Sequence, residues 1–156
     1  MPAVKGLLAM SKQFSSLQPL QIVAKPSRTD LAYVEARLDA YNAASTEIFD
    51  GRLLSVVLKQ GDGEICAGLH GHTWGQCCEI KVIWIAESNR GQGLGSALLR
   101  YAELEAKLRG CRQIVLSTHS FQAPDFYEKA GYNRVATVQD YPSGHTHILM
   151  VKQLRS

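Results

Sequence analysis

The stretch that decides the fold reads Arg90-Gly91-Gln92-Gly93-Leu94-Gly95-Ser96, and it stands between an apolar run and an amphipathic helix. Glycines let the backbone turn tightly and come close to a ligand. The first N–H groups of a helix lack internal partners, and the helix dipole favours negative charge there. We therefore expect the N–H groups of Gln92 to Ser96 to hold a pyrophosphate, with a charge-assisted contact from Arg90.

Two familiar nucleotide-binding loops do not fit this spacing. A P-loop closes with Gly-Lys-Ser/Thr, whereas this stretch has Leu94 after the glycine and no lysine. A dinucleotide fingerprint needs G-x-G-x-x-G, and here serine stands at position 96. The spacing that remains, Arg-x-x-Gly-x-Gly, also occurs in plain surface turns before a helix.

A second motif further along the chain narrows the choice. It reads Ala123-Pro124-Asp125-Phe126-Tyr127-Glu128-Lys129-Ala130-Gly131-Tyr132. Together the two stretches resemble the Gcn5-related N-acetyltransferases (GNAT), whose motifs are Gln/Arg-x-x-Gly-x-Gly/Ala and Ala-x-x-Phe/Leu-Tyr-x-x-x-Gly-Phe/Tyr in this order. The resemblance spans residues 80–154, while residues 1–50 share only a coarse strand-then-helix pattern. The family often has asparagine three residues before the alanine, where this chain has Ser120.

The composition is that of an ordinary globular protein. The chain has 156 residues, of which 46% are hydrophobic and 20% charged, enough to bury a core. The net charge of +3, without a Lys/Arg cluster, predicts no nucleic-acid partner. No apolar run suits a signal peptide or membrane span, so we expect a cytoplasmic protein with no membrane partner. We assign residues 1–18 to an N-terminal arm and 19–156 to a single domain; a homodimer through the arm or a strand edge stays open.

The hydrophobic periodicity predicts the element order β-α-β-β-β-α-β-α-β-β. This order is typical of an α/β (α+β) fold with a mixed, mostly antiparallel sheet flanked by helices, and the GNAT fold shares it. The expected strands are residues 20–25, 53–59, 64–74, 76–86, 113–118, 132–139 and 145–154. The first expected helix is capped by Ser27 or Thr29, and a short remnant of the family's second helix is expected at residues 45–50. Two further helices are expected at residues 94–109 and 124–129. One side of the 94–109 helix is expected to carry Leu94, Ala97, Leu98, Tyr101, Ala102, Glu105 and Leu108.

Acyl transfer from a thioester to an amine needs an uncharged amine and a proton for the departing thiolate. A lysine-like amine, with a pKa of about 10.4, is almost all ammonium at neutral pH and must lose a proton. A phenol, with a pKa of about 10, keeps its proton and can pass it to a thiolate. We therefore predict Tyr127 as the proton donor, a role that the resemblance also implies; a tyrosine that only packs on the core is the alternative.

The strand before the glycine-rich stretch supplies the other predicted groups. Glu79 is the predicted base, and its place resembles that of the base glutamate in histone-type members; Asp140, a histidine or water are the alternatives. The resemblance implies that the main chain of Ile83 and Ile85 pairs with the pantetheine arm of the cofactor, with one N–H facing the thioester carbonyl. Ser120 is expected to contact that arm with a shorter reach than asparagine.

Histidines and cysteines complete the candidates. Because side chains alternate along a strand, His70 and His72 are expected on one face of their strand, and His145 and His147 on one face of theirs. Each pair would either line an acceptor pocket or lie on ordinary surface. No spacing predicts a metal site. The cysteines are expected to be buried free thiols without a partner base, which favours direct attack over an acyl-cysteine. They are Cys66, Cys77, Cys78 and Cys111.

The sequence thus predicts an N-acetyltransferase that moves the acetyl group of acetyl-CoA to a primary amine of a small molecule in a ternary complex, without a metal. A non-catalytic acetyl-CoA-binding sensor and a protein-lysine acetyltransferase are the alternatives. The predicted cofactor-binding residues are Ile83, Ile85, Arg90, Gly91, Gln92, Gly93, Leu94, Gly95, Ser96, Ser120 and Tyr127.

Overall fold

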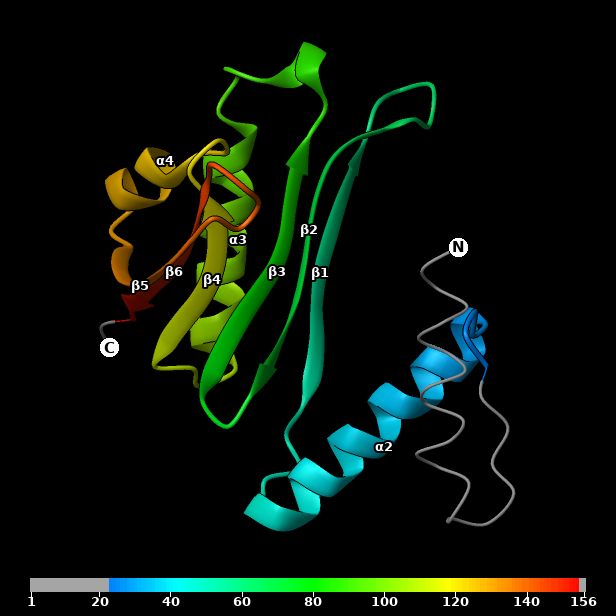
Figure 1. Cartoon of the computed structure of the whole chain (residues 1–156). Coiled ribbons are helices and arrows are strands. Elements are labelled where there is room, and N and C mark those ends of the chain that lie inside the picture. The colour runs from blue at the N-terminus through cyan, green and yellow to red at the C-terminus, as the bar shows by residue number, and fades with distance from the viewer. Residues whose placement is uncertain (1–22, 155–156) are drawn as a thin grey trace. The chain divides into compact units, whose positions relative to one another are not determined.

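The computed structural model describes residues 23–154 (Figure 1). The chain divides into two units between Thr46 and Glu47, and each is described by itself. The predicted arm over residues 1–18 and most of the first predicted strand lie outside the described residues, and Val23–Lys25, the described end of that strand, has no strand structure. No helix in the described range is both long and apolar enough to cross a membrane.

The first unit contributes one described helix, α2 (Arg28–Thr46). The Asp30 N–H donates to Ser27 Oγ at 3.1 Å, and the Ser27 N–H donates to Asp30 Oδ2 at 2.8 Å. This reciprocal pair is a capping box, so Ser27 is the cap and the alternative, Thr29, is wrong. The predicted short helix at 45–50 is also wrong, because α2 continues to its end at Thr46 and an irregular connection follows.

The second unit is built on a six-stranded mixed sheet (Figure 1). The strands are β1 (Arg52–Lys59), β2 (Ile65–Trp74), β3 (Cys77–Ile85), β4 (Gln113–His119), β5 (Asn133–Gln139) and β6 (Thr146–Gln153). They lie in the order β1-β2-β3-β4-β6-β5, and only the β3–β4 pair is parallel among those described. The predicted fold class, a mixed and mostly antiparallel sheet flanked by helices, is confirmed.

A bulge in β3 shifts the faces of that strand. Gly71 of β2 pairs with Ile80, whereas His70 pairs with Val82, so Lys81 is left over in the register. Because of this extra residue, Ile80 is buried while Val82 is exposed, although simple alternation would put both on one face. A Cβ on Gly71 would overlap the carbonyl oxygen of Glu79, so the bulge requires a residue without a side chain here.

β3 and β4 separate beyond the bulge. Their parallel pairing ends at the Ile80–Leu116 pair, although β3 continues to Ile85 and β4 to His119. Figure 1 shows the two strands further apart toward the end of β3. The last residues of β3 therefore have a backbone edge, on the side of β4, that no described strand covers.

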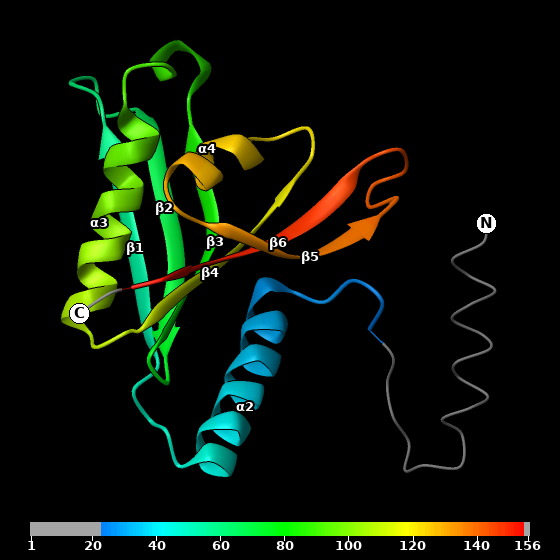
Figure 2. The same cartoon turned by 90° about the vertical axis from the view of Figure 1, so that its left-hand side faces the viewer.

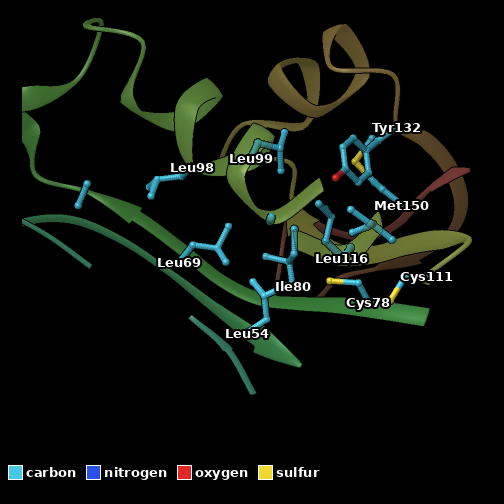
Figure 3. Packing of buried hydrophobic residues seen from close by; sticks show 14 of the residues in the cluster. Leu54, Leu69, Cys78, Ile80, Leu98, Leu99, Cys111, Leu116, Tyr132 and Met150 are labelled. Carbon is cyan, nitrogen blue, oxygen red and sulfur yellow. The ribbon is translucent and has the colours of Figure 1, made fainter. Parts of the chain in front are cut away.

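The buried core lies between the sheet and α3 (Leu94–Leu108), which runs along β1, β2 and β3 (Figures 2 and 3). The short helix α4 (Pro124–Lys129) precedes β5, and its Phe126 and Tyr127 pack against the same core. The larger buried residues are Leu54, Leu69, Cys78, Ile80, Leu98, Leu99, Ile114, Leu116, Tyr132, Ile148 and Met150.

The buried side of α3 differs from the predicted one. Its buried residues are Leu98, Leu99, Ala102 and Ala106. The predicted stripe puts Tyr101 and Leu108 on the buried side of the helix, but these two residues are 42% and 84% exposed. Leu98, Ala102 and Ala106 are spaced four residues apart and form a ridge, and such a ridge is inclined to the helix axis. The small alanine side chains let the helix lie close to the sheet. The predicted stripe is therefore right at Leu98 and Ala102 and wrong at Tyr101 and Leu108.

Candidate active site

The glycine-rich loop joins β3 to α3 and leaves the start of the helix open. Gly91 and Gly93 have φ of 73° and 80°, and no atom lies within 4 Å of a Cβ built on either. The first intrahelical N–H donor is Ala97, which donates to the carbonyl of Gly93 at 3.0 Å. Among residues 23–154, no side chain caps the N-terminus of α3. The N–H groups of the first turn therefore face open space, as an anion site requires.

Gly95 lets the start of α3 approach two other elements closely. A Cβ at this position would lie 3.1 Å from Ile85 Cδ1 and 3.4 Å from Phe126 Cζ. These contacts bring the helix N-terminus, the end of β3 and α4 together. Both predicted motifs thus meet at one place in the fold.

The polar side chains of the loop bind the loop's own backbone. Arg90 Nε donates to the carbonyl of Ile85 at 3.3 Å, and Gln92 Nε2 donates to the carbonyl of Ser88 at 3.2 Å. The remaining guanidinium nitrogens of Arg90, which is exposed, are available to an anion. Arg90 and Gln92 therefore first shape the loop, while their predicted contacts with a pyrophosphate stay predictions.

The free edge of β3 carries the two isoleucines expected to bind the cofactor arm. The Ala86 N–H donates to the carbonyl of Cys66 on β2 at 2.8 Å. Since N–H groups alternate along a strand, those of Ile83 and Ile85 point to the opposite edge, where β4 has diverged. Their side chains pack against the core. Backbone groups of both residues are thus left for an extended ligand.

Tyr127 lies on α4, half-buried between two other rings. Its ring centroid is 5.1 Å from that of Phe126 and 6.1 Å from that of Tyr132. Burial raises the pKa of the Tyr127 phenol, so it keeps its proton at neutral pH. Its hydroxyl has no hydrogen-bond partner within residues 23–154. This arrangement suits a proton donor.

Glu79 lies on the opposite face of the sheet from α3. It pairs across strands with His72, whose Nε2 is 3.5 Å from Glu79 Oε2, and the two side chains are 37% (His72) and 48% (Glu79) exposed. Its neighbours in the strand, Cys78 and Ile80, face the core. The predicted acid and base therefore come from opposite sides of the sheet.

Ser120 is engaged by β6. Its Oγ accepts the N–H of Thr146 at 3.0 Å, and its own N–H donates to the carbonyl of Thr146 at 2.8 Å. The hydroxyl can still donate one hydrogen bond. Ser120 thus continues the β4–β6 ladder, and its predicted contact with the cofactor arm stays a prediction.

Comparison with known proteins decides the family. Residues 51–134 match the family model described as an acetyltransferase (GNAT) domain. The chain belongs to the GNAT acetyltransferases. It is 42% identical over 93 residues to a blasticidin-S acetyltransferase from Streptomyces morookaense, covering 59% of this chain and 68% of that protein.

Two further relatives cover more of this acetyltransferase. It is 32% identical over 124 residues to an acetyltransferase from Agrobacterium fabrum, covering 76% of this chain and 90% of that protein. A crystal structure of an acetyltransferase from Bacillus cereus has a TM-score of 0.70 at 34% identity, over 86% and 98% of the two chains. The family resemblance and the enzyme class predicted from the two motifs are confirmed.

The acetyltransferase also has a ring cluster that the sequence reasoning missed in part. It consists of His119, Phe121, Tyr141, His145 and His147, with centroid separations of 4.9–5.7 Å. His145 lies in the turn before β6 and not in the strand, so the predicted pairing of His145 and His147 on one strand face is wrong. His119 and Phe121 come just before the second motif, but only the pairing of β4 with β6 brings them to the histidines of the hairpin.

The cysteines of the acetyltransferase are free in the described structure, and Cys77 alone among them is only half-buried. Burial, with the neighbouring Cys111 and Cys77, raises the pKa of the Cys78 thiol to about 12. Burial also raises the pKa of Cys111 and of Cys77. These thiols are poor nucleophiles because little thiolate forms at neutral pH. Within the described part of the chain, no three His, Cys, Asp or Glu side chains group to hold a metal ion.

Proposed function

We propose that this acetyltransferase moves the acetyl group of acetyl-CoA to a primary amine of a small molecule, by direct attack in a ternary complex. The observation that carries the proposal is that the open N-terminus of α3 lies next to the end of β3, whose edge toward β4 is unpaired beyond Ile80, since Gly95 packs against Ile85. A pyrophosphate fits the first, because open space surrounds Gly91 and Gly93. An extended arm fits the second, where the N–H groups of Ile83 and Ile85 can pair with it.

The proposed reaction needs three proton transfers. The acceptor ammonium first loses a proton to a base, for which Glu79, beside His72, is the candidate. The free amine then attacks the thioester carbonyl, so that a C–N bond forms and the C–S bond breaks. Tyr127, which burial keeps protonated at neutral pH, donates its proton to the departing thiolate. The nitrogen loses its extra proton as the amide forms, and this proton restores the Tyr127 phenol. The raised thiol pKa values of Cys78 and Cys111 support direct attack over an acyl-cysteine.

A small-molecule acceptor is supported by the blasticidin-S acetyltransferase, which matches this chain at 42% identity. A protein-lysine acceptor and a non-catalytic sensor of acetyl-CoA are the competing functions. The cytoplasmic location, the homodimer and the domain boundaries at residues 18 and 19 stay predictions.

Cofactor binding is tested by a tryptophan at Gly93. Gly93→Trp fills the open space before α3 and is expected to abolish CoA binding in isothermal titration. Gly110→Trp is the matched control, because Gly110 also has a positive φ, 78°, and open space, at the other end of α3. Equal binding by both variants would contradict the proposed placement, and thermal unfolding shows whether each variant is folded.

Enzyme and sensor are separated by Tyr127→Phe. Loss of a general acid typically costs about a hundredfold or more in rate, so kcat should fall by about that factor while CoA binding is retained. Tyr101→Phe, on the exposed side of α3, is the control and should match the wild type. Normal turnover by Tyr127→Phe would refute the acid role, and absence of turnover in the wild type would favour the sensor.

A further inference from the structure

The ring cluster gathers three segments at the end of the sheet. His119 ends β4, Phe121 follows in the loop to α4, and Tyr141, His145 and His147 come from the β5–β6 hairpin. The rings of His119 and Phe121 are stacked, with centroids 5.2 Å apart and an interplanar angle of 21°. Phe121 and Tyr141 are 54% and 57% exposed. The cluster thus presents aromatic faces that the described structure does not cover.

The backbone holds this cluster in place. Ser120 and Thr146 exchange two hydrogen bonds, which join the loop that carries Phe121 to the start of β6. In the hairpin, the Tyr141 N–H donates to the carbonyl of His145 at 3.0 Å. The rings therefore come from a backbone that is already fixed, which lowers the entropy cost of binding a ligand.

The hydrogen bonds of Gln122 set the tautomer of His119. Gln122 Oε1 lies 2.9 Å from the backbone N of His119 and 3.1 Å from the hydroxyl of Thr118. A backbone N–H can only donate, so the amide atom that faces it is the oxygen. The same oxygen lies 3.3 Å from His119 Nδ1. The neutral ring therefore carries its proton on Nδ1 and a lone pair on Nε2, which has no hydrogen-bond partner among the described residues.

The cluster lies beside the proposed transfer site. Along β4, His119 stands three residues beyond Leu116, the last residue that pairs with β3. Along β3, Ile83 stands three residues beyond Ile80, and one of those three is the extra residue of the bulge. His119 and Ile83 are thus at nearly the same level on the two diverging strands. His119 faces away from the core, on the same side of the sheet as Glu79, because its strand neighbour Thr118 is buried.

We propose that the ring cluster binds the acceptor and selects a primary amine that carries a planar aromatic ring, with His119 Nε2 accepting a hydrogen bond from an N–H of that acceptor. This inference rests on the proposed function. Stacked rings favour a flat π system, whereas a polycationic acceptor needs carboxylates. The cluster contains none, and the nearby Asp140 uses Oδ1 to accept the N–H of Gly144 within its own turn.

The test compares amines of matched size in acetyl-CoA turnover. Phenylethylamine and cyclohexylethylamine have similar volume but differ in planarity, and tryptamine adds a ring N–H. The wild type should prefer phenylethylamine to cyclohexylethylamine and tryptamine to both. Phe121→Leu should raise the KM for the aromatic amines by about threefold to tenfold, the range expected for loss of one ring contact, and leave cyclohexylethylamine unchanged.

Two further variants complete the design. His119→Asn keeps a donor toward Gln122 and lacks Nε2, so it should remove the added preference for tryptamine. Phe49→Leu, at a phenylalanine that is 75% exposed and outside the cluster, is the control and should change nothing. Turnover without preference for aromatic amines, or a preference that Phe121→Leu leaves intact, would overturn this inference alone. Absence of turnover with every amine would overturn the proposed function and this inference with it.

Discussion

Replacing Gly71 with alanine tests the bulge from which β3 and β4 diverge. A Cβ there would overlap the carbonyl oxygen of Glu79 and lie 2.9 Å from both the Glu79 carbonyl carbon and Ile80 Cα. All three are backbone atoms, so no side-chain rotation can relieve the contact and β2 must move away from β3. Overpacking of this kind costs about 1–3 kcal/mol, and loss of one cross-strand hydrogen bond adds about 1 kcal/mol. We expect the free energy of unfolding to fall by about 2–4 kcal/mol.

Thermal unfolding followed by circular dichroism measures this effect. In a protein of this size, 1 kcal/mol corresponds to about 2–4 °C in Tm, so Gly71→Ala should lower the Tm by roughly 5–15 °C. Gly61→Ala is the control, because no atom lies within 4 Å of its Cβ, and its Tm should stay close to the wild type. If the two variants unfold at the same temperature, the two strands do not approach each other as described and the origin of the divergence is different.

Two further predictions concern the core. Lys152 Nζ donates to Glu103 Oε1 and to the carbonyl of Ala130, both at 2.8 Å. Lys152→Met removes both hydrogen bonds, so we expect the free energy of unfolding, measured in urea, to fall by about 1–3 kcal/mol. Lys107 is exposed, so Lys107→Met is the control and should leave the free energy of unfolding unchanged. The pKa of Cys78 is raised from 9.0 to about 12 on folding, so the unfolded chain loses its thiol proton first and stability should decline as the pH rises above 9. A stability that stays flat from neutral pH to the alkaline side of 9 would contradict the burial of this thiol.

The candidate site could be predicted from the sequence because its main parts use the backbone. The glycines at 91, 93 and 95 and the second motif mark a turn, a close approach and a helix start, all of which depend on local residue type. The structure places Gly95 against Ile85 and Phe126, so the two motifs meet in space. Tyr127 lies on the predicted helix, half-buried as a tyrosine next to the core would be.

Other features depend on contacts between distant residues. The extra residue, Lys81, lies in the nearly unbroken apolar run from Ile80 to Ile85. Such a run does not alternate between apolar and polar residues, so no change in the pattern reveals the bulge. The close approach of the Glu79 backbone to Gly71 shows that this place requires a glycine, and it is visible only in the structure. The ring cluster is likewise assembled from the end of β4 and a hairpin some twenty residues later, so its rings could not be grouped by local spacing.

The most direct test of the proposed activity is to follow the acetyl group of acetyl-CoA. Purified protein would be incubated with acetyl-CoA and a panel of polyamines, amino acids, arylamines, aminoglycosides and lysine peptides, with Tyr127→Phe alongside. Free CoA would be quantified by chromatography, so that the protein's own thiols do not interfere, and the acceptors would be analysed by mass spectrometry. We expect CoA to be released only when a small-molecule amine is present, together with an equal amount of the acetylated amine. The rate should be much lower for Tyr127→Phe. Binding of acetyl-CoA without acetylation of any amine in the panel would contradict the proposed activity.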